Sequence, residues 1–302
     1  MSKSIIQRLT LRQLTYLLAL QEHQHFGRAA AACAVTQSTL SSALAELELI
    51  LETQLVERSK RSLRFTAVGL VVAAHARDVI RSVEDLCEGL QSEREALVGT
   101  LRMAAIPTIA PFLLPRIVTA VGARWPRLRL FVREMLTSGA CEALQRNTVD
   151  CVLLALPAEC GDVAICEIMA DQLLVAARPR EGAALGEVSE LTADPSRLLL
   201  LDEGHCLRDQ ALAACNLSNA SSESPLIAST LQTLVQMVDA GLGVTFVPQM
   251  AVAAGILHGT RVTSRAIRPG VERRIALVWR KRSPRASDLQ LLGATIRAAV
   301  IT

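Results

Sequence analysis

The chain has 302 residues, of which 51% are hydrophobic and 3% aromatic, and its formal net charge is +3. This length allows two or more domains, whose cores must be built mainly from aliphatic side chains. No apolar run is long enough for a membrane helix, and no apolar signal segment begins the chain, so we expect a cytoplasmic protein whose thiols stay reduced. So small a net charge does not by itself indicate a nucleic-acid partner.

Residues 11–48 carry the pattern of packed helices joined by a turn. Leucines recur at helical spacing before an alanine-rich helix that begins at Phe26, and a second helix is predicted over residues 39–48. One side of this second helix is apolar, whereas its N-terminal end is polar. Uncharged hydrogen-bonding groups suit base edges and phosphates. The residues expected to contact DNA are Gln37, Ser38, Thr39 and Ser42.

A short basic run follows over residues 57–64. In isolation such a run more often forms a solvated loop, but beside a polar-tipped helix it predicts the wing of a winged helix-turn-helix. The basic residues expected to contact phosphate are Arg58, Lys60, Arg61 and Arg64. The alternative, a plain helical bundle, gives no reason for the polar helix end and the basic run to occur together.

The next segment is predicted to form a long linker helix. Apolar residues fall at alternating three- and four-residue steps from Ala76 to Leu97, which is typical of a coiled-coil seam and predicts a dimer. A dimer suits a helix-turn-helix protein because two half-sites reinforce each other. The residues expected to form the dimer contact are Val79, Val83, Leu86 and Leu90. Gly99 ends the helix, and a hinge is predicted at residues 92–100.

From Thr100 onward, predicted strands alternate with predicted helices, which indicates a doubly wound α/β fold. The strands are Leu101–Ile106, Leu128–Val132, Cys151–Ala155, Leu173–Ala177, Leu198–Leu201, Val244–Val247 and Ile275–Trp279. The helices between them include Phe112–Arg124, Ala140–Asn147, Leu231–Ala240 and Ala286–Ala299. Ligands in such folds bind beyond the carboxyl ends of strands, where Thr108 and Thr137 fall. Spacing alone favours ordinary capping or turn roles for these two threonines.

Two of the eight cysteines, Cys206 and Cys215, lie nine positions apart. A helix that begins at Cys206, with His205 before it and Arg208 after it, would lower the thiol pKa and favour the reactive thiolate. A helix of nine steps rises roughly 13.5 Å, whereas a disulfide needs Cα atoms about 4.4–6.8 Å apart. A bond between these thiols would therefore force local refolding and turn oxidation into a conformational signal. The alternative is a pair of inert thiols.

None of the other six cysteines forms a Cys-x-x-Cys pair, so we expect no structural zinc, no other metal and no cofactor. Most of these six are interpreted as buried, small apolar residues. They are Cys33, Cys87, Cys141, Cys151, Cys160 and Cys166.

Several segments together resemble a known family. They include residues 19–26, 106–108, 111–115, 150–156 and, most specifically, 202–212, which carries the first of the two cysteines at the family's spacing from the second. Residues 9–66 resemble the DNA-binding domain of LysR-type transcriptional regulators, and the resemblance continues to the C-terminus. Within that family, the chain is most similar to the hydrogen-peroxide-sensing OxyR group.

The resemblance implies three parts: a DNA-binding domain over residues 1–66, a linker helix over 67–99 and an effector domain over 100–302. The effector domain would have two lobes, as in periplasmic binding proteins, with lobe I at about residues 100–170 plus 270–302 and lobe II at about 171–269. It also implies a homodimer and a tetramer, promoter DNA and RNA polymerase as partners, and re-reduction by a glutaredoxin or thioredoxin system.

The resemblance further implies roles for residues in the effector domain. Cys206 would be the peroxidatic cysteine, which peroxide oxidises to a sulfenic acid, and Cys215 would be the resolving cysteine, which captures it. The residues that would line the peroxide pocket are His205, Thr108, Thr137 and Arg274, and Asp209 would support the redox loop.

The sequence departs from the family pattern at Ala45 and Glu46, where the relatives are basic, at Thr36–Thr39 and after Cys215, where an aromatic residue is missing. Two other functions were weighed. One is a LysR-type regulator that binds a small metabolite between the lobes near Thr108 and Thr137, with incidental cysteines. The other is a thiol peroxidase, but in an enzyme the helix-turn-helix and dimer seam would have no purpose. We therefore expect a regulator and not an enzyme.

Overall fold

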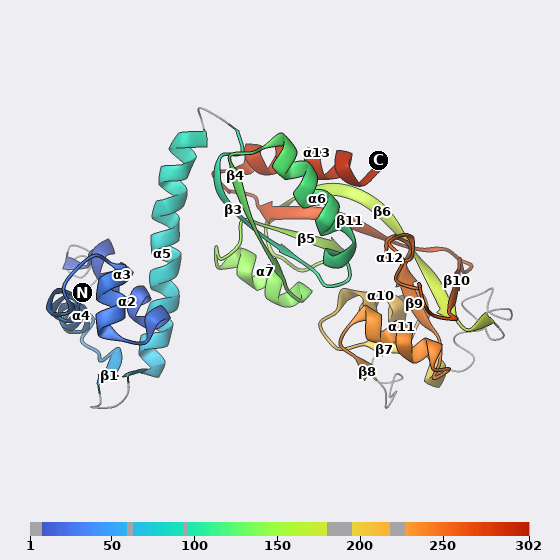
Figure 1. The fold of residues 1–302 in the computed structure, drawn as a ribbon, viewed down its shortest axis with the longest axis horizontal. Coiled ribbons are helices and arrows are strands. Elements are labelled where there is room, and N and C mark those ends of the chain that lie inside the picture. The colour runs from blue at the N-terminus through green and yellow to red at the C-terminus, as the bar shows by residue number, and fades with distance from the viewer. Residues whose placement is uncertain (1–7, 59–62, 93–95, 180–194, 218–226, 302) are drawn as a thin grey trace. The chain divides into compact units, whose positions relative to one another are not determined.

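The computed structural model describes residues 8–58, 63–92, 96–179, 195–217 and 227–301. The chain divides into two compact units, residues 1–90 and 91–302. Each unit is described by itself (Figure 1). No helix among these described residues is both long and apolar enough to cross a bilayer.

The first unit is a winged helix-turn-helix followed by a long helix, so the fold predicted for this part is confirmed. Its elements are α2 (Leu11–His23), α3 (Phe26–Ala32), α4 (Gln37–Ile50), β1 (Val56–Arg58), β2 (Leu63–Phe65) and α5 (Ala67–Ser92). Strands β1 and β2 pair antiparallel and form the sides of the wing. Buried leucines from α2 and α4, including Leu17, Leu20, Leu40 and Leu44, fill the core between the helices.

Capping groups set where these helices begin. The Thr10 hydroxyl accepts a hydrogen bond from the backbone N–H of Gln13, and the Gln13 side-chain oxygen accepts one from the backbone N–H of Thr10. This reciprocal capping box starts α2. The Thr36 hydroxyl caps the N-terminus of α4 by accepting a hydrogen bond from the backbone N–H of Thr39. Gly69 lies in the first turn of α5 so close to the backbone that an added Cβ would sit 2.0 Å from the carbonyl oxygen of Leu55.

The second unit is built on one mixed sheet of seven strands in the order β10-β6-β11-β5-β3-β4, with β9 paired to β6. The strands are β3 (Gly99–Ala105), β4 (Leu128–Glu134), β5 (Cys151–Leu156), β6 (Val163–Ala177), β9 (Thr245–Pro248), β10 (Thr263–Arg265) and β11 (Val271–Arg280). Strands β4, β3 and β5 are parallel, whereas β11 runs antiparallel to both β5 and β6. The predicted strands at 173–177 and 275–279 are therefore parts of two longer strands.

Helices and two short strands complete this unit. They are α6 (Ala110–Arg124), α7 (Thr137–Gln145), α10 (Cys206–Ala214), α11 (Leu231–Asp239), α12 (Gln249–Ala253), α13 (Ala286–Ile301), the short 3-10 helix at Pro195–Arg197, β7 (Leu200–Leu201) and β8 (Ile227–Ala228). Helices α6 and α13 pack against each other, while α10 and α11 lie beside β7 (Figure 1).

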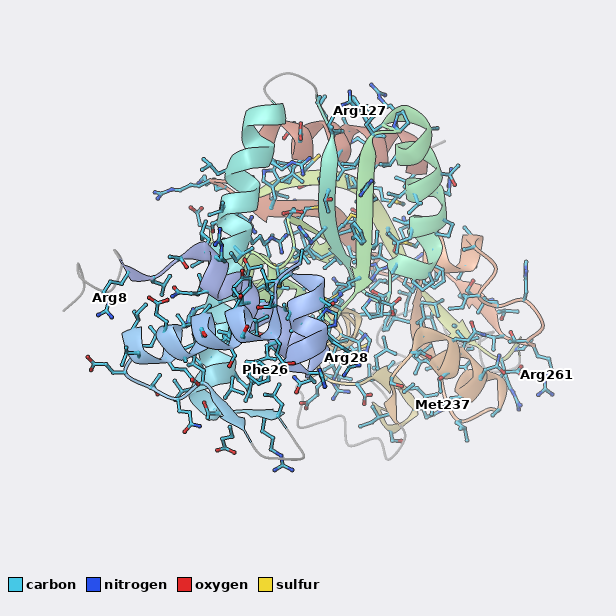
Figure 2. The ribbon with its side chains drawn as sticks, turned by 60° about the vertical axis from the view of Figure 1, so that its left-hand side comes forward. Arg8, Phe26, Arg28, Arg127, Met237 and Arg261 are labelled. Carbon is cyan, nitrogen blue, oxygen red and sulfur yellow. A yellow bond between two sulfur atoms is a disulfide. The ribbon has the colours of Figure 1, made fainter. Side chains whose placement is uncertain are left out.

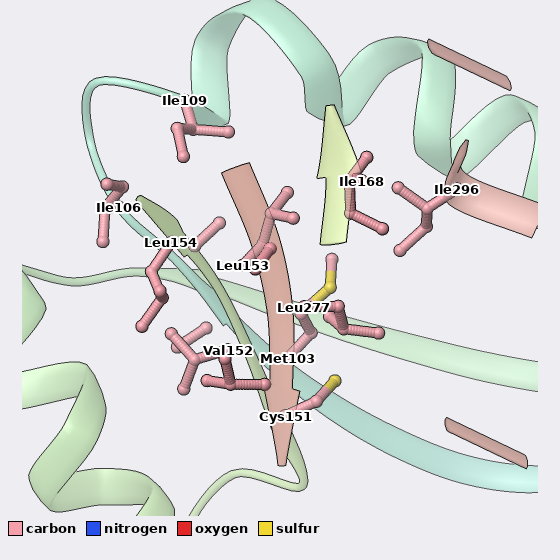
Figure 3. Close-up of a cluster of buried hydrophobic side chains, with 14 of the residues drawn as sticks. Met103, Ile106, Ile109, Cys151, Val152, Leu153, Leu154, Ile168, Leu277 and Ile296 are labelled. Carbon is pink, nitrogen blue, oxygen red and sulfur yellow. The ribbon is translucent and has the colours of Figure 1, made fainter. Parts of the chain in front are cut away.

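Two hydrophobic cores divide this unit into lobes. The first core is formed by β3, β5, the first part of β6, β11, α6, α7 and α13, and Figure 3 shows its centre around Met103, Leu153 and Leu277. The second core is formed by the last part of β6, β7, β9, α10 and α11. Because β6 contributes to both cores, it connects the two lobes.

The cysteines depart from expectation at one place. Cys141 and Cys160 are buried, as expected for most of the six, but they form a disulfide, so for this pair the expectation that the thiols stay reduced is wrong. Among the described residues, Cys33, Cys151, Cys166, Cys206 and Cys215 are free thiols, and the side chain of Cys87 lies outside the described set. The spacing of 19 residues gave no local signal for this bond.

Candidate redox site and nucleic-acid interface

Cys206 is the first residue of α10 and is 8% exposed. The turn before it depends on Gly204, whose φ of +89° lies in the left-handed region. His205 occupies the N-cap position, but its side chain makes no capping hydrogen bond. The helix predicted to start at Cys206 is therefore present, and its thiol lies at the buried N-terminal end of that helix.

Arg273 is the buried cation of this site. Its side chain lies on β11, is 1% exposed and donates from Nε to Oδ2 of Asp171 at 2.9 Å. The other two nitrogens donate to Thr108, at 3.0 Å to the hydroxyl and 3.1 Å to the carbonyl oxygen. Asp171 also accepts from the backbone N–H of Met250 at 2.9 Å. These bonds fix the guanidinium in one orientation between the two lobes.

Two threonine hydroxyls complete the surroundings of the thiol. Thr108 precedes α6 and is 2% exposed, and Thr137 is the first residue of α7. The Thr137 hydroxyl is buried and has no partner within hydrogen-bond geometry, although it lies near enough to Cys206 to favour the thiolate. The structure thus brings together Cys206, Thr108 and Thr137, three of the predicted residues, although they come from distant parts of the sequence.

Burial raises the pKa of Cys206 above its usual value, and this effect outweighs the others. Arg273, Thr137 and Thr108 oppose it by favouring the thiolate, while the carboxylate of Asp209 adds to it. The expectation that the helix start, His205 and Arg208 would lower the thiol pKa is therefore wrong. The site as a whole therefore favours the thiol over the thiolate, and the groups that oppose this effect come from β11, from the segment before α6 and from the start of α7.

The surroundings of His205 disfavour its positively charged form. It is 5% exposed, and burial lowers its pKa, with Asp202, the Ser229 backbone and Glu134 acting in the opposite direction. Its Nδ1 is buried without a hydrogen-bond partner. Arg208 is also buried, and its guanidinium donates to the carbonyl oxygen of Leu201 at 3.1 Å.

Arg274 does not line the buried site as predicted, and Asp209, predicted to support the redox loop, lies outside it. Arg274 follows Arg273 on β11, so its side chain points to the opposite face of the sheet, where it pairs with Glu167 at 2.8 Å and is 60% exposed. The arginine of the site is Arg273, which sequence reasoning missed by one residue. Asp209 is exposed in the first turn of α10, and its charge disfavours the Cys206 thiolate.

Cys215 caps the C-terminal end of α10 and is 2% exposed. It packs in the core of the second lobe, whereas Cys206 packs in the core of the first. Burial raises the pKa of Cys215 as well. With α10 intact, nine helical steps separate the thiols by roughly 13.5 Å along the axis, which is about twice the span that a disulfide allows.

A cavity of about 840 Å³ lies beside the redox site, between the lobes. Its walls include Pro107, Phe112 and Leu136 from the first lobe and Asp202, His205, Arg208 and Ser229 from the second. His205, the residue before Cys206, thus lies in the wall of the cavity. Thr108 and Thr137 are not among its lining residues, but their chain neighbours Pro107 and Leu136 are, so the cavity lies near the place where the metabolite alternative expects its effector.

In the first unit, the predicted DNA-contacting residues Gln37, Ser38, Thr39 and Ser42 are all exposed in the first turns of α4. Arg64 is exposed on β2 and lies opposite Glu57 on β1. Lys60 and Arg61 lie outside the described residues, as does the side chain of Arg58. Figure 2 shows Arg28 on α3, an exposed cation of the same unit that was not predicted.

The acidic residues of α4 have structural partners. Glu46 accepts a hydrogen bond from the side chain of Gln13 at 3.1 Å, which joins α4 to α2. Glu48 accepts from the backbone N–H groups of Leu55 and Val56 at 2.8 and 3.0 Å and so holds the base of the wing. Glu46, one of the departures from the family pattern, therefore contributes to packing.

The long helix α5 exposes part of its predicted seam. Val79 is 43% exposed and Leu86 65% exposed, and Val83 is half-buried. The side chain of Leu90 lies outside the described set. Ala76 packs instead in the core of the first unit, and Leu97 packs in the first lobe of the second. These two residues are therefore not available to a coiled-coil seam.

Two family models match the chain. The model described as "Bacterial regulatory helix-turn-helix protein, lysR family" matches residues 11–70, and the model described as "LysR substrate binding domain" matches residues 94–300. The chain belongs to the LysR family of transcriptional regulators. The predicted family and fold class are thus confirmed, and this LysR-type regulator belongs to a class of DNA-binding proteins rather than to a class of enzymes.

Individual proteins agree with this assignment. The regulator is 36% identical to the OxyR regulator of Escherichia coli K12, over 96% of this chain and 95% of that protein, and 36% identical to the EstR regulator of Acinetobacter baylyi, over 94% of each. Among solved structures, a full-length OxyR variant from Pseudomonas aeruginosa is 32% identical with a TM-score of 0.74 and covers 96% of this chain and 95% of that one. A Corynebacterium glutamicum OxyR mutant with bound hydrogen peroxide has 30% identity and a TM-score of 0.66, covering 97% and 92%.

Proposed function

We propose that this LysR-type regulator senses hydrogen peroxide through Cys206 and reports it to promoter DNA by forming a disulfide with Cys215. The observation that carries the proposal is the placement of these two thiols at opposite ends of one intact helix, in two different cores. The similarity to OxyR proteins over nearly the whole chain supports it.

The first chemical step is the attack of the Cys206 thiolate on one oxygen of the peroxide. The O–O bond breaks, the sulfur becomes a sulfenic acid, and the second oxygen leaves as hydroxide, which takes up the thiol proton and becomes water. Arg273 and the hydroxyls of Thr108 and Thr137 act on the thiol and favour its ionised form. The same donors suit a small, polar oxidant, because they can hold one oxygen and stabilise charge on the departing one.

The second step joins the two cysteines. The sulfur of Cys215 attacks the sulfenic sulfur of Cys206, the S–S bond forms, and a second water leaves. In total, two thiols and one hydrogen peroxide give one disulfide and two waters. Arg273 does not need to move in this step, because its three hydrogen bonds go to Asp171 and Thr108, which lie outside α10.

The conformational consequence follows from the length of α10. A disulfide cannot span the intact helix, so residues 206–215 must unwind, and Cys206 or Cys215 must leave the core in which it packs. The lobe surfaces on either side of α10 then change. We propose that this change alters the spacing of DNA-binding domains within an oligomer and so switches transcription.

The partners proposed with this function follow the same reasoning. Double-stranded promoter DNA would meet the exposed polar end of α4 and the wing. The exposed apolar residues of α5 would form a homodimer, with a tetramer, contact with RNA polymerase and a glutaredoxin or thioredoxin system completing the cycle in the cytoplasm. Residues 1–66, 67–99 and 100–302 would then be the DNA-binding, linker and effector parts.

A regulator that answers to a metabolite remains the second candidate, and the interlobe cavity is the observation in its favour. It is less well supported, because it assigns no role to the buried cluster of Cys206, Arg273, Thr108 and Thr137. It predicts that replacing Cys206 leaves the effector response intact.

The experiment that tests the proposal measures DNA binding before and after about one equivalent of hydrogen peroxide. Fluorescence anisotropy or footprinting on promoter DNA should change for the native chain and for the Cys33→Ser control, a cysteine outside the effector unit. It should not change for Cys206→Ser. A peroxide response that persists in Cys206→Ser would show that the proposed sensor chemistry is wrong.

A further inference from the structure

The disulfide between Cys141 and Cys160 joins two elements near the redox site. Cys141 lies on α7, one helical turn after Thr137, and is 5% exposed. Cys160 lies between β5 and β6 and is 2% exposed. Their Cα atoms are 4.7 Å apart, which falls within the range of about 4.4–6.8 Å that a disulfide needs.

A second contact fastens the same two elements. The side chain of Gln145, at the end of α7, donates to the carbonyl oxygen of Cys160. Gly161 makes room for it: its φ is +75°, and an added Cβ would lie 2.6 Å from the Gln145 side chain. Helix α7 is therefore held against the segment after β5 at both its middle and its end.

This fastening acts on one of the groups that favour the Cys206 thiolate, the hydroxyl of Thr137. Thr137 begins α7. Strand β5, which leads to Cys160, pairs with β11 in a register that sets Leu156 opposite Arg274, the neighbour of Arg273. A change in how α7 is held would thus move the Thr137 hydroxyl relative to the sulfur of Cys206, while Arg273 stays fixed by Asp171 and Thr108.

The two cysteine pairs of this unit have different redox states. Cys206 and Cys215 are thiols, while Cys141 and Cys160 are bonded. The first pair cannot bond without unwinding α10, whereas the second is already at bonding distance in the folded chain. The second pair therefore opens and closes with less rearrangement.

We propose that Cys141 and Cys160 form a second redox couple, whose thiol or disulfide state sets the reactivity of Cys206 by positioning α7. A dithiol reductant opens the couple by donating two electrons and two protons and leaves as a disulfide. Hydrogen peroxide closes it again, with loss of two waters. Neighbouring Glu159, Gly161 and Asp162 are exposed, so a local opening of this segment gives a reductant access.

The existence of the couple and its effect on Cys206 need separate tests, because only the second rests on the proposed function. The first test equilibrates the native chain in dithiothreitol and in glutathione buffers of graded ratio, traps free thiols and maps peptides by mass spectrometry. The couple predicts that Cys141 and Cys160 pass together from bonded to free within the glutathione range. A bond that persists across that whole range, or thiols that stay free in it, would overturn the couple.

The second test uses a Cys215→Ser background, in which Cys206 cannot be resolved. The rate of Cys206 alkylation is followed against pH, with the Cys141–Cys160 bond closed or opened by dithiothreitol. Loss of a hydrogen bond to the thiolate predicts a rate about fivefold lower at neutral pH when the bond is open. Cys141→Ser should reproduce the open state.

Cys166→Ser is the matched control, because Cys166 is a buried free thiol of the same lobe and accepts from Arg297 at 3.5 Å. It should leave the rate unchanged. An equal rate with the bond open and closed would overturn the coupling. If Cys206 failed to react with peroxide in either state, the proposed function would fall, whereas the redox titration of Cys141 and Cys160 would stand by itself.

Discussion

Arg273 and Arg274 offer a sharp test, because two adjacent arginines on one strand have opposite surroundings. Arg273 is 1% exposed and makes three directed hydrogen bonds, to Asp171 and twice to Thr108. Arg274 is 60% exposed in a pair with Glu167. The perturbation is Arg→Lys at each position, which keeps the charge but removes the planar fork.

The expected magnitudes differ widely. A lysine at position 273 cannot donate to all of the acceptors on Asp171 and Thr108, so some of these buried acceptors lose their hydrogen bonds. This loss should lower the free energy of unfolding by about 3 kcal/mol. A lysine ammonium displaced from the position of the guanidinium should also raise the pKa of Cys206 further, and each rise of one pKa unit lowers the thiolate fraction about tenfold. At position 274 the pair is exposed and screened, so the expected cost is at most about 1 kcal/mol with no change in oxidation rate.

Two assays measure these effects. Urea denaturation followed by circular dichroism gives the unfolding free energy, and stopped-flow competition with a peroxide-consuming enzyme gives the rate of Cys206 oxidation. The account expects a slow and less stable Arg273→Lys protein beside a nearly native Arg274→Lys protein. Equal rates and equal stabilities in the two variants would refute the placement of Arg273 at the site.

Three further predictions concern pH, the resolving cysteine and the recognition helix. Because burial raises the pKa of Cys206, its oxidation rate should climb steadily as pH rises from about 6 to about 9; a rate independent of pH would contradict this. The same raised pKa has a consequence for stability: the contribution of the Cys206 thiol is fully present below the pKa of an unfolded thiol, about 8.5, and is lost as pH rises through the higher pKa of the folded state. Alkaline denaturation curves of the native chain and of Cys206→Ser should therefore differ at low pH and converge at high pH. Cys215→Ser should accumulate a sulfenic acid at Cys206 that dimedone traps, without a DNA response; a normal response would remove Cys215 from the mechanism. Thr36→Ala should lower the free energy of thermal unfolding by about 1 kcal/mol through loss of the α4 cap, with the exposed Ser42→Ala as a control outside the cap; equal stabilities of the two variants would contradict the cap.

The parts of this protein that sequence reasoning predicted are those set by local patterns. The helix-turn-helix follows from apolar periodicity and from the cap at Thr36. The start of α10 at Cys206 follows from a strand-like run, a short polar turn with Gly204 and then a helical pattern. Each of these signals lies within a few residues of the feature that it predicts.

The features that sequence reasoning missed, the arginine of the redox site and the disulfide, depend on contacts between residues that are distant in the sequence. Which of two adjacent arginines faces inward is decided by strand register, and a shift of one residue exchanges the faces of a strand. The partners that would identify Arg273 are Asp171 and Thr108, which are 102 and 165 residues away. A disulfide such as Cys141–Cys160 likewise depends on the packing of α7 against the segment after β5, because pairing among eight cysteines is not determined by spacing.

The raised pKa of Cys206 was also missed because it depends on how distant parts of the chain pack together. Local neighbours predicted a stabilised thiolate, but the burial of the thiol in the first core outweighs the groups that favour its ionised form. Burial is a property of the assembled lobe and has no counterpart in the residues on either side of Cys206.

Peptide mass spectrometry tests the central claim most directly. The native chain would be exposed briefly to about one equivalent of hydrogen peroxide in the presence of a thiol-trapping reagent, and its cysteine-containing peptides would be mapped. The account predicts a loss of two hydrogens in a new Cys206–Cys215 linkage, with Cys151 and Cys166 still trapped as thiols. Free thiols at both Cys206 and Cys215 after this treatment would contradict it.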